Sequence, residues 1–364
     1  MIVQDVIDHL HDLAPLNYAE DFDNVGLLVG DKNQKVNGIL VTLDTLEVVV
    51  DEAIENKCNL IVSFHPIIFK GLKKITGKSY VERVVIKAIK HGIAIFSIHT
   101  ALDNAYEGVN SIICDKLGLE NKKILIPQPG NIKKLQTYVP KENAAELRNA
   151  LFKAGAGSLG NYESCSFNVE GKGTYLGNDD SNPAIGEKGQ LHTESETAIS
   201  VIFKKHLETQ VLKALFTNHP YEEVAYEIVS LNNTDVNTGM GMTGELRQPM
   251  EEKKCLELVQ KTFNSECIRH SKLRSRPIKK VAVLGGSGSF AIKAAKASNA
   301  DLFITADLKY HDFFTAEDDI VLADIGHYES EQFTKSFLVD YLSKKITSFA
   351  IILSKTNTNP VKYL

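Results

Sequence analysis

Both ends of this 364-residue chain repeat one pattern, a short apolar run followed by a polar turn and an amphipathic helical stretch. Strands and helices that alternate in this way form mostly parallel sheets covered by helices. The pattern therefore predicts two α/β halves of the doubly wound type. The apolar runs of the first half are NGILVTLD, NLIVSFHP and IAIFSIHT, and those of the second half are KKVAVLGGSGS, DLFITADL and DIVLADIG.

The middle of the chain has a different order of segments, β-α-β-β-α-β, which is the ferredoxin-like order. Turn-forming residues between 175 and 192 predict a long loop in its central hairpin. We therefore expect an inserted α+β domain over residues 126–245, between α/β halves at 1–125 and 246–364. The six segments are LQTYVP, ENAAELRNALFKAG, SCSFNVEGKGTYL, TAISVIFKK, LETQVLKALFTN and YEEVAYEIVSL.

The charge and cysteine content exclude several classes of protein. A net charge of -5 gives no chain-wide basic field, so nucleic acid is a poor default partner, and we interpret the basic run 269–276 as solvated surface. The five scattered cysteines form no C-x-x-C pair, which predicts a reducing compartment. The N-terminus does not have the pattern of a signal peptide, and no apolar run reaches the roughly 20 residues of a membrane helix. These features predict a cytoplasmic protein without membrane contact.

Metal-type side chains follow several of the apolar runs. In open α/β sheets, ligands bind beyond the carboxyl ends of the strands, so residues at these positions are the first candidates for a site. A lone histidine there is more often structural, and it is their coincidence that favours a site. The candidates are His65, His99 with Asp103, Asp307 with His311, and His327 with Glu331.

The spacing of His327 and Glu331 places both on one face of a helix that starts after Gly326, so one metal ion can contact both. Imidazole and carboxylate ligands suit zinc, manganese or iron, and a site with few protein ligands leaves room for an activated water. The alternatives are that Asp103 caps a helix and that Glu331 is a solvated helix residue.

Three further motifs allow both a functional and a structural interpretation. Asp44 and Asp307 are hypothetical partners that orient ligating histidines. The loop 285–289, GGSGS, exposes amides that suit a phosphate, although a tight strand-to-helix turn needs glycine in any case. His219, in the turn NHPYEE, is interpreted as structural.

Seven motifs together resemble the NIF-three-like family over nearly the whole chain, in the long form with a central insertion similar to the CutA and PII folds. Members of this family are often named GTP cyclohydrolase 1 type 2 homologs. The motifs are EDFDNVGLLVGD, VTLD, SFHPIIFKG, SIHTALDN, GGSGS, TADLKYHD and GHYESE.

This resemblance implies a toroidal homohexamer in which each subunit holds a dinuclear centre. By motif, His65 and Asp103 would bind one metal, His327 would bind the other, and Glu331 would contact both. The family usually has a second histidine where this chain has Phe64, which offers no lone pair. Three outcomes follow: a single metal, a weakened second site, which we favour, or replacement by His99 or His311.

The sequence therefore predicts a divalent-metal protein with one or two zinc, manganese or iron ions per chain. We expect a metal-dependent hydrolase acting on a nucleotide or a related small molecule. Glu331, His99 and His311 are the candidate catalytic residues, and His65, Asp103, His327 and Glu331 are the candidate ligands. The alternative is a non-enzymatic metal-binding or regulatory assembly, in which the inserted domain senses a ligand or contacts a partner.

Overall fold

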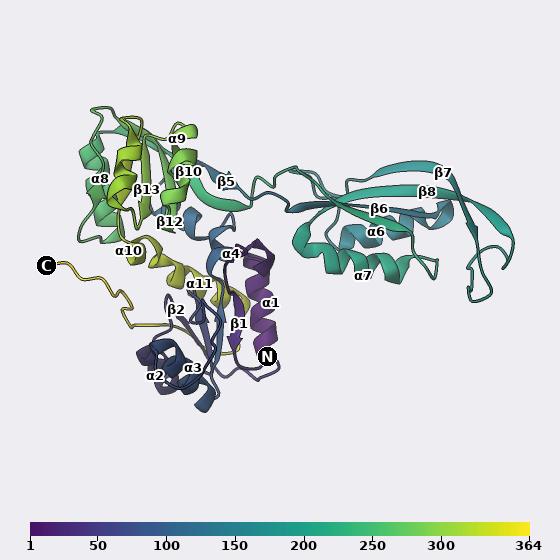
Figure 1. Cartoon of the computed structure of the whole chain (residues 1–364), viewed down its shortest axis with the longest axis horizontal. Helices are drawn as coiled ribbons and strands as arrows, with labels where there is room; N and C mark the ends of the chain where they lie inside the picture. Colours follow the sequence, from purple (N-terminus) through teal and green to yellow (C-terminus); the bar gives the residue numbers. More distant parts are fainter. The chain divides into compact units, whose positions relative to one another are not determined.

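The computed structural model describes all 364 residues, which form two compact units (Figure 1). The larger unit combines residues Met1–Pro127 and Val236–Leu364, and the smaller unit is Gln128–Asp235. The smaller unit ends before the expected boundary at residue 245, because strand β10 (Gly239–Met250) pairs with two strands of the larger unit. No helix is long and apolar enough to cross a membrane.

The first sheet of the larger unit has the strand order β1-β4-β3-β2-β15. Strands β4, β3, β2 and β15 run parallel to one another, and β1 is antiparallel to its neighbour β4. Leu40, Ile61 and Ile95 face helices α2 and α3, whereas their neighbours along each strand face the opposite side. The strands are β1 (Gly26–Val29), β2 (Ile39–Thr42), β3 (Leu60–Ser63), β4 (Ala94–Ser97) and β15 (Ile351–Leu353).

The second sheet has the order β11-β14-β13-β12-β10-β5. Strands β12, β13 and β14 are parallel, and the outer strands are antiparallel to them. Phe303 and its neighbours on one face pack under helix α9. Besides β10, the strands are β5 (Glu120–Pro127), β11 (Arg269–His270), β12 (Ile278–Ser287), β13 (Leu302–Ala306) and β14 (Val321–Asp324).

The remaining face of each sheet contributes to one shared core. Val41 and Val62 of the first sheet belong to the same buried cluster as Val283 and Ile304 of the second. The two halves also exchange strands, since β5 precedes the smaller unit yet joins the second sheet, and β15 ends the chain yet joins the first. The core is therefore one body rather than two independent halves.

The helices of the larger unit cover these sheets. Helix α10 begins directly after Gly326, as the spacing of His327 and Glu331 predicts. The helices are α1 (Val3–Leu13), α2 (Glu47–Glu55), α3 (Tyr80–Lys90), α4 (His99–Asp103), α5 (Val109–Lys116), α8 (Glu252–Phe263), α9 (Ile292–Ala297), α10 (His327–Glu331) and α11 (Phe333–Lys345), with 3-10 turns η1 (Leu16–Tyr18), η4 (Ser289–Ala291) and η5 (Tyr310–Ala316).

The smaller unit has the ferredoxin-like element order, with the antiparallel sheet β7-β8-β6-β9 and a core of its own. The predicted fold class, two α/β halves with a ferredoxin-like α+β unit, is confirmed. The elements are β6 (Ile132–Pro140), η2 (Lys141–Asn143), α6 (Ala144–Lys153), β7 (Phe167–Leu176), β8 (Leu191–Lys204), η3 (Lys205–Leu207), α7 (Glu208–Asn218) and β9 (Tyr226–Ser230).

Candidate metal centre

Three side chains of the larger unit converge as a group able to hold a metal ion. His65 follows β3, whereas His327 and Glu331 are the first and last residues of α10. One ligand atom from each lies within 4.8 Å of the others. The Glu331 Oε2 atom lies 3.1 Å from His65 Nε2 and 3.2 Å from His327 Nε2. The shared core brings together strand ends that are far apart in the sequence.

The surroundings of the Glu331 carboxylate indicate whether a metal ion fits these three residues. Its side chain is only 3% exposed, and its Oε2 atom has no hydrogen bond, although it lies within ion-pair distance of both histidine rings. A buried carboxylate oxygen without a hydrogen bond is costly, and a cation placed among these atoms would compensate its charge. Two imidazoles and a carboxylate are also a donor set that zinc, manganese and iron accept. The residues therefore fit a divalent metal ion.

A carboxylate holds the other ring nitrogen of each histidine near the centre. Asp44 lies 2.8 Å from His65 Nδ1, and Asp307 lies 2.7 Å from His327 Nδ1. Since a carboxylate can only accept, each Nδ1 carries a proton, and loss of the second proton would leave a lone pair on Nε2 for a metal ion. Asp307 has a left-handed backbone, φ 57°, which is strained for a residue with a side chain. Both hypothetical orienting aspartates thus contact the predicted histidine ligands.

The centre binds protons strongly when no metal is present. Burial opposes protonation of His65, but the charges of Glu331 and Asp44 outweigh it and raise its pKa to about 10. Burial likewise opposes protonation of His327, and Asp307 and Glu331 raise its pKa to about 11. Burial favours the neutral form of Glu331, yet the two histidines hold its pKa at about 2. Without a metal ion, the two imidazolium rings therefore supply the positive charge that a divalent cation would otherwise supply.

Asp103, the last residue of α4, lies in the electrostatic surroundings of this group but outside the three converging residues. Its Oδ1 atom is buried and has no hydrogen-bond partner. Burial and the Glu331 charge raise the pKa of its carboxyl well above the usual range. Its role as a ligand remains a prediction.

Two glycines leave room for the centre. A Cβ atom on Gly286, which has φ +67°, would lie 2.4 Å from Glu331 Oε1. The amides of Gly285 and Gly286 donate to Asn110 and Ser330, so they are not free to bind a phosphate. The GGSGS motif therefore permits a close approach to Glu331, and the structure favours the steric interpretation of this loop.

The other predicted residues differ in their surroundings. The ring of His99 lies 5.1 Å from that of His65, and its Nδ1 contacts Asp23 at 2.9 Å. Phe64 is fully buried, with its ring packed against both histidines. His311 is exposed on η5, stacked against aromatic neighbours, and does not join the metal group.

A cavity of about 530 Å³ opens beside His65 and His327. Arg269 lines it and forms an ion pair with Asp324, which also lines it. Other members of the basic run are neutralised as well, since Arg274 pairs with Asp301 and with buried Glu252. Arg269 and Arg274 of the run 269–276 are therefore both paired with carboxylates.

A family model described as Duf34/NIF3 (NGG1p interacting factor 3) matches residues 1–360 of this chain. The chain belongs to the Duf34/NIF3 family. Among its relatives are the GTP cyclohydrolase 1 type 2 homolog of Bacillus subtilis, 37% identical over 99% of this chain and 98% of the relative, and that of Staphylococcus epidermidis, 35% identical over the full length of both. A solved Bacillus cereus protein related to NIF3 has a TM-score of 0.85 and 34% identity over 100% of this chain and 99% of its own.

The C-terminal tail of this Duf34/NIF3 protein contacts the centre, which sequence reasoning did not predict. The Thr358 hydroxyl donates to Asp44 Oδ2 at 2.5 Å, while Asp44 Oδ1 holds His65. Asn359 donates to Glu329, and Val361 and Tyr363 line the cavity. The polar sequence TNTNP carries no periodic signal, so only the fold reveals this contact. The contact of Asp23 with His99 is not predicted from the sequence either, although the place of Asp23 in the EDFDN motif is a usable signal.

Metal binding to the Duf34/NIF3 centre is expected to strengthen as pH rises from 6 to 9. Because the pKa values of His65 and His327 are raised to about 10 and 11, both rings are protonated over this range and must release their protons to bind an ion. Zinc titration calorimetry in buffers of different ionisation enthalpy should detect up to about two protons released per ion. A proton count near zero at pH 7 would contradict this charge balance.

Thr358→Val should weaken zinc affinity by about tenfold or more, because it removes the hydroxyl that orients Asp44 behind His65. Thr356→Val is the matched control, since that hydroxyl lies in the same tail but donates to Glu52. Competition with a chromogenic chelator measures both affinities, and Thr358→Ser should restore the wild-type value. Equal effects of the two valine variants would mean that the tail acts only by packing against the larger unit and that the Thr358 hydrogen bond to Asp44 has no specific role.

Proposed function

We propose that this Duf34/NIF3 protein is a divalent-metal-dependent hydrolase that acts on a nucleotide or a related small molecule. The observation that carries the proposal is the buried Glu331 oxygen, which has no hydrogen bond and lies between the Nε2 atoms of two aspartate-held histidines, beside an open cavity. His65, His327 and Glu331 would hold the ion, with Asp103 as the further ligand that the family motif implies.

A bound divalent ion would supply Lewis-acid activation of water or of a carbonyl or phosphoryl oxygen. Asp44 and Asp307 keep the two imidazoles oriented toward the centre, and burial excludes bulk water from Glu331. His99 is the better placed of the two proton-transfer candidates, because Asp23 fixes its Nδ1 and its ring adjoins His65. A neutral imidazole fixed in this way can accept a proton at its Nε2 atom.

The class of substrate rests on the relatives and on the cavity. The curated relatives are named GTP cyclohydrolase 1 type 2 homologs, which supports a purine nucleotide as the first compound to assay. The cavity volume of about 530 Å³ lies in the range of small-molecule sites. We also propose the family's homohexamer as the assembly, with zinc, manganese or iron as the ion and the cytoplasm as the compartment.

Phe64 favours a second candidate, a metal-binding regulatory assembly without turnover. The residue is 0% exposed and puts a hydrocarbon ring where the family motif has a histidine. The loss of one metal ligand weakens the binding of a second ion. A centre that holds one ion is a poorer catalyst for reactions that need two.

Glu331→Gln should abolish metal-dependent hydrolysis, with a loss of at least about 100-fold, because it replaces the buried anion by a neutral amide. The assay uses the manganese-, zinc- or iron-loaded protein with GTP, other nucleotides and model esters. Glu317→Gln is the control, since that exposed carboxylate pairs with Lys296 instead. Turnover that survives in Glu331→Gln or after chelation would refute the metal-dependent reaction, and no turnover across the panel would favour the regulatory assembly.

Phe64→His should raise the metal content of the purified protein from about one ion toward two per chain, because it restores an imidazole beside His99. Plasma mass spectrometry of the wild type, Phe64→His and His327→Ala gives the counts. His327→Ala should lower the content, as it removes one converging ligand. A wild-type protein that already holds two ions would show that other residues compensate for Phe64.

A further inference from the structure

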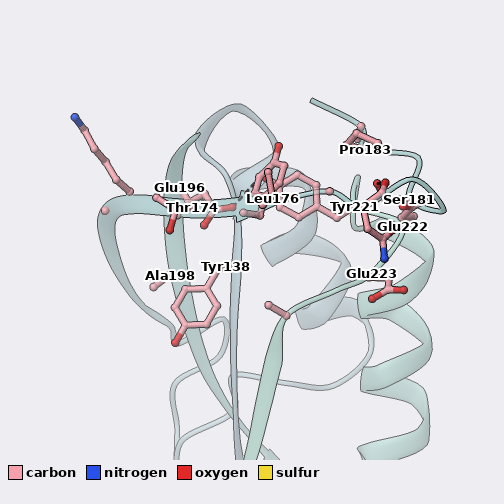
Figure 2. A pocket seen from close by; sticks show the side chains of 18 of the residues that line it. Tyr138, Thr174, Leu176, Ser181, Pro183, Glu196, Ala198, Tyr221, Glu222 and Glu223 are labelled. Carbon is pink, nitrogen blue, oxygen red and sulfur yellow. Dashed lines mark hydrogen bonds between the residues drawn. The ribbon is translucent and has the colours of Figure 1, made fainter. Parts of the chain in front are cut away.

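A second cavity, of about 940 Å³, lies wholly within the smaller unit and includes none of the proposed metal ligands (Figure 2). Its walls are the hairpin β7–β8, the loop that joins these two strands, and the turn after α7. Figure 2 shows Glu196 and Thr174 on one side, Ser181 and Glu223 on the other, and Tyr221 between them. This volume is ample for a small organic ligand.

The floor of the cavity is shaped around Glu196. A Cβ atom on Gly173, two residues along β7 from the residue that pairs with Glu196, would lie 2.0 Å from Glu196 Oε2. Glycine at this position therefore lets the carboxylate lie across the backbone of β7. The Tyr221 hydroxyl donates to Glu196 Oε1 at 2.8 Å. The charge is held in place but is not neutralised by a cation.

The opposite wall is also preformed. The Tyr175 hydroxyl donates to the carbonyl of Ile185 at 2.7 Å, and the amide of Asn182 donates to Glu222 Oε1 at 2.6 Å. These bonds fasten the long loop to the hairpin and to the turn. A cavity fixed before the ligand arrives lowers the entropic cost of binding.

His219 fixes the turn that carries Tyr221. Its Nδ1 accepts from the Tyr221 amide at 3.1 Å, and its Nε2 donates to the Tyr138 carbonyl at 3.0 Å. Both ring nitrogens are therefore engaged with the backbone, which agrees with the structural interpretation of His219. Tyr221 is in turn packed edge-on against Tyr175, with their ring centroids 5.9 Å apart.

The chemistry of the lining favours a ligand with positive charge and a hydrocarbon body. Carboxylates outnumber cationic groups, and aromatic faces suit ammonium groups through cation–π contacts. Alkyl segments between the charges would pack on the same rings. The carboxylates are Asp180, Glu196, Glu222 and Glu223, the cation is Lys172, and the aromatic residues are Tyr138, Tyr175 and Tyr221.

A metal ion fits this cavity less well than an organic cation. The group of ligand atoms close enough to share an ion lies in the larger unit, around Glu331. In the cavity, Glu196 and Glu222 are fastened to different donors and do not converge. Spaced negative charges match spaced ammonium groups rather than a single point charge.

We propose that this cavity is a binding site for a small linear polyamine, and therefore a ligand site separate from the metal centre. Spermidine should bind the full-length, metal-loaded protein with a stoichiometry of about one per chain, as measured by calorimetry at moderate salt. Glu196→Gln should weaken binding at least about tenfold, because it removes the charge on the cavity floor.

Glu223→Gln is a second test. This carboxylate is exposed, so its replacement should leave the folding of the smaller unit unchanged. Glu170→Gln is the matched control: it removes the same charge from β7, but Glu170 pairs with Lys141 and does not line the cavity. Weaker binding in the first two variants and wild-type binding in the control would support the site. Unsaturable binding, an equal loss in Glu170→Gln, or equal binding of 1,8-octanediol or Mg²⁺ would overturn it.

Discussion

The shared hydrophobic core between the two sheets is the constraint on which the rest of the larger unit depends. Alternate residues of the central strands point into it, such as Val62 of β3 and Ile304 of β13, and their neighbours point toward the covering helices. Because the side-chain period is two, a register slip of one residue would turn this face toward the covering helices and disrupt the shared core. Fixing both sheets on one core brings the strand ends that carry His65 and His327 together, although most of the chain lies between them.

The buried charge of Glu331 is the second constraint, and it depends on the first. Only a rigid core can hold a carboxylate at 3% exposure beside two histidines without a hydrogen bond to one of its oxygens. The surrounding residues accommodate it at a cost, since Asp307 has a left-handed backbone and Gly286 cannot carry a side chain. Strain of this kind is tolerated where the surrounding structure over-determines a conformation, which is common at functional sites.

The smaller unit is built on the same principles but has different chemistry. Its core is separate, and its cavity of about 940 Å³ is lined by tyrosines and carboxylates rather than by converging imidazoles. The chain therefore has two separately built candidate sites, the metal group in the larger unit and the cavity in the smaller one. If both proposals hold, the protein would combine metal chemistry in one unit with recognition of an organic cation in the other.

The sequence by itself determined the local structure and named the three residues that converge as candidate metal ligands. Its apolar periodicity marked β2, β3, β4, β13 and β14, and the i, i+4 spacing after Gly326 placed His327 and Glu331 on one helix face, because these periods are intrinsic to strands and helices. The tertiary structure alone decided that β5 and β15 exchange between the sheets, that β10 leaves the smaller unit, and that Thr358 supports Asp44. These contacts join residues distant in the chain, and such pairings depend on how faces pack rather than on any local pattern.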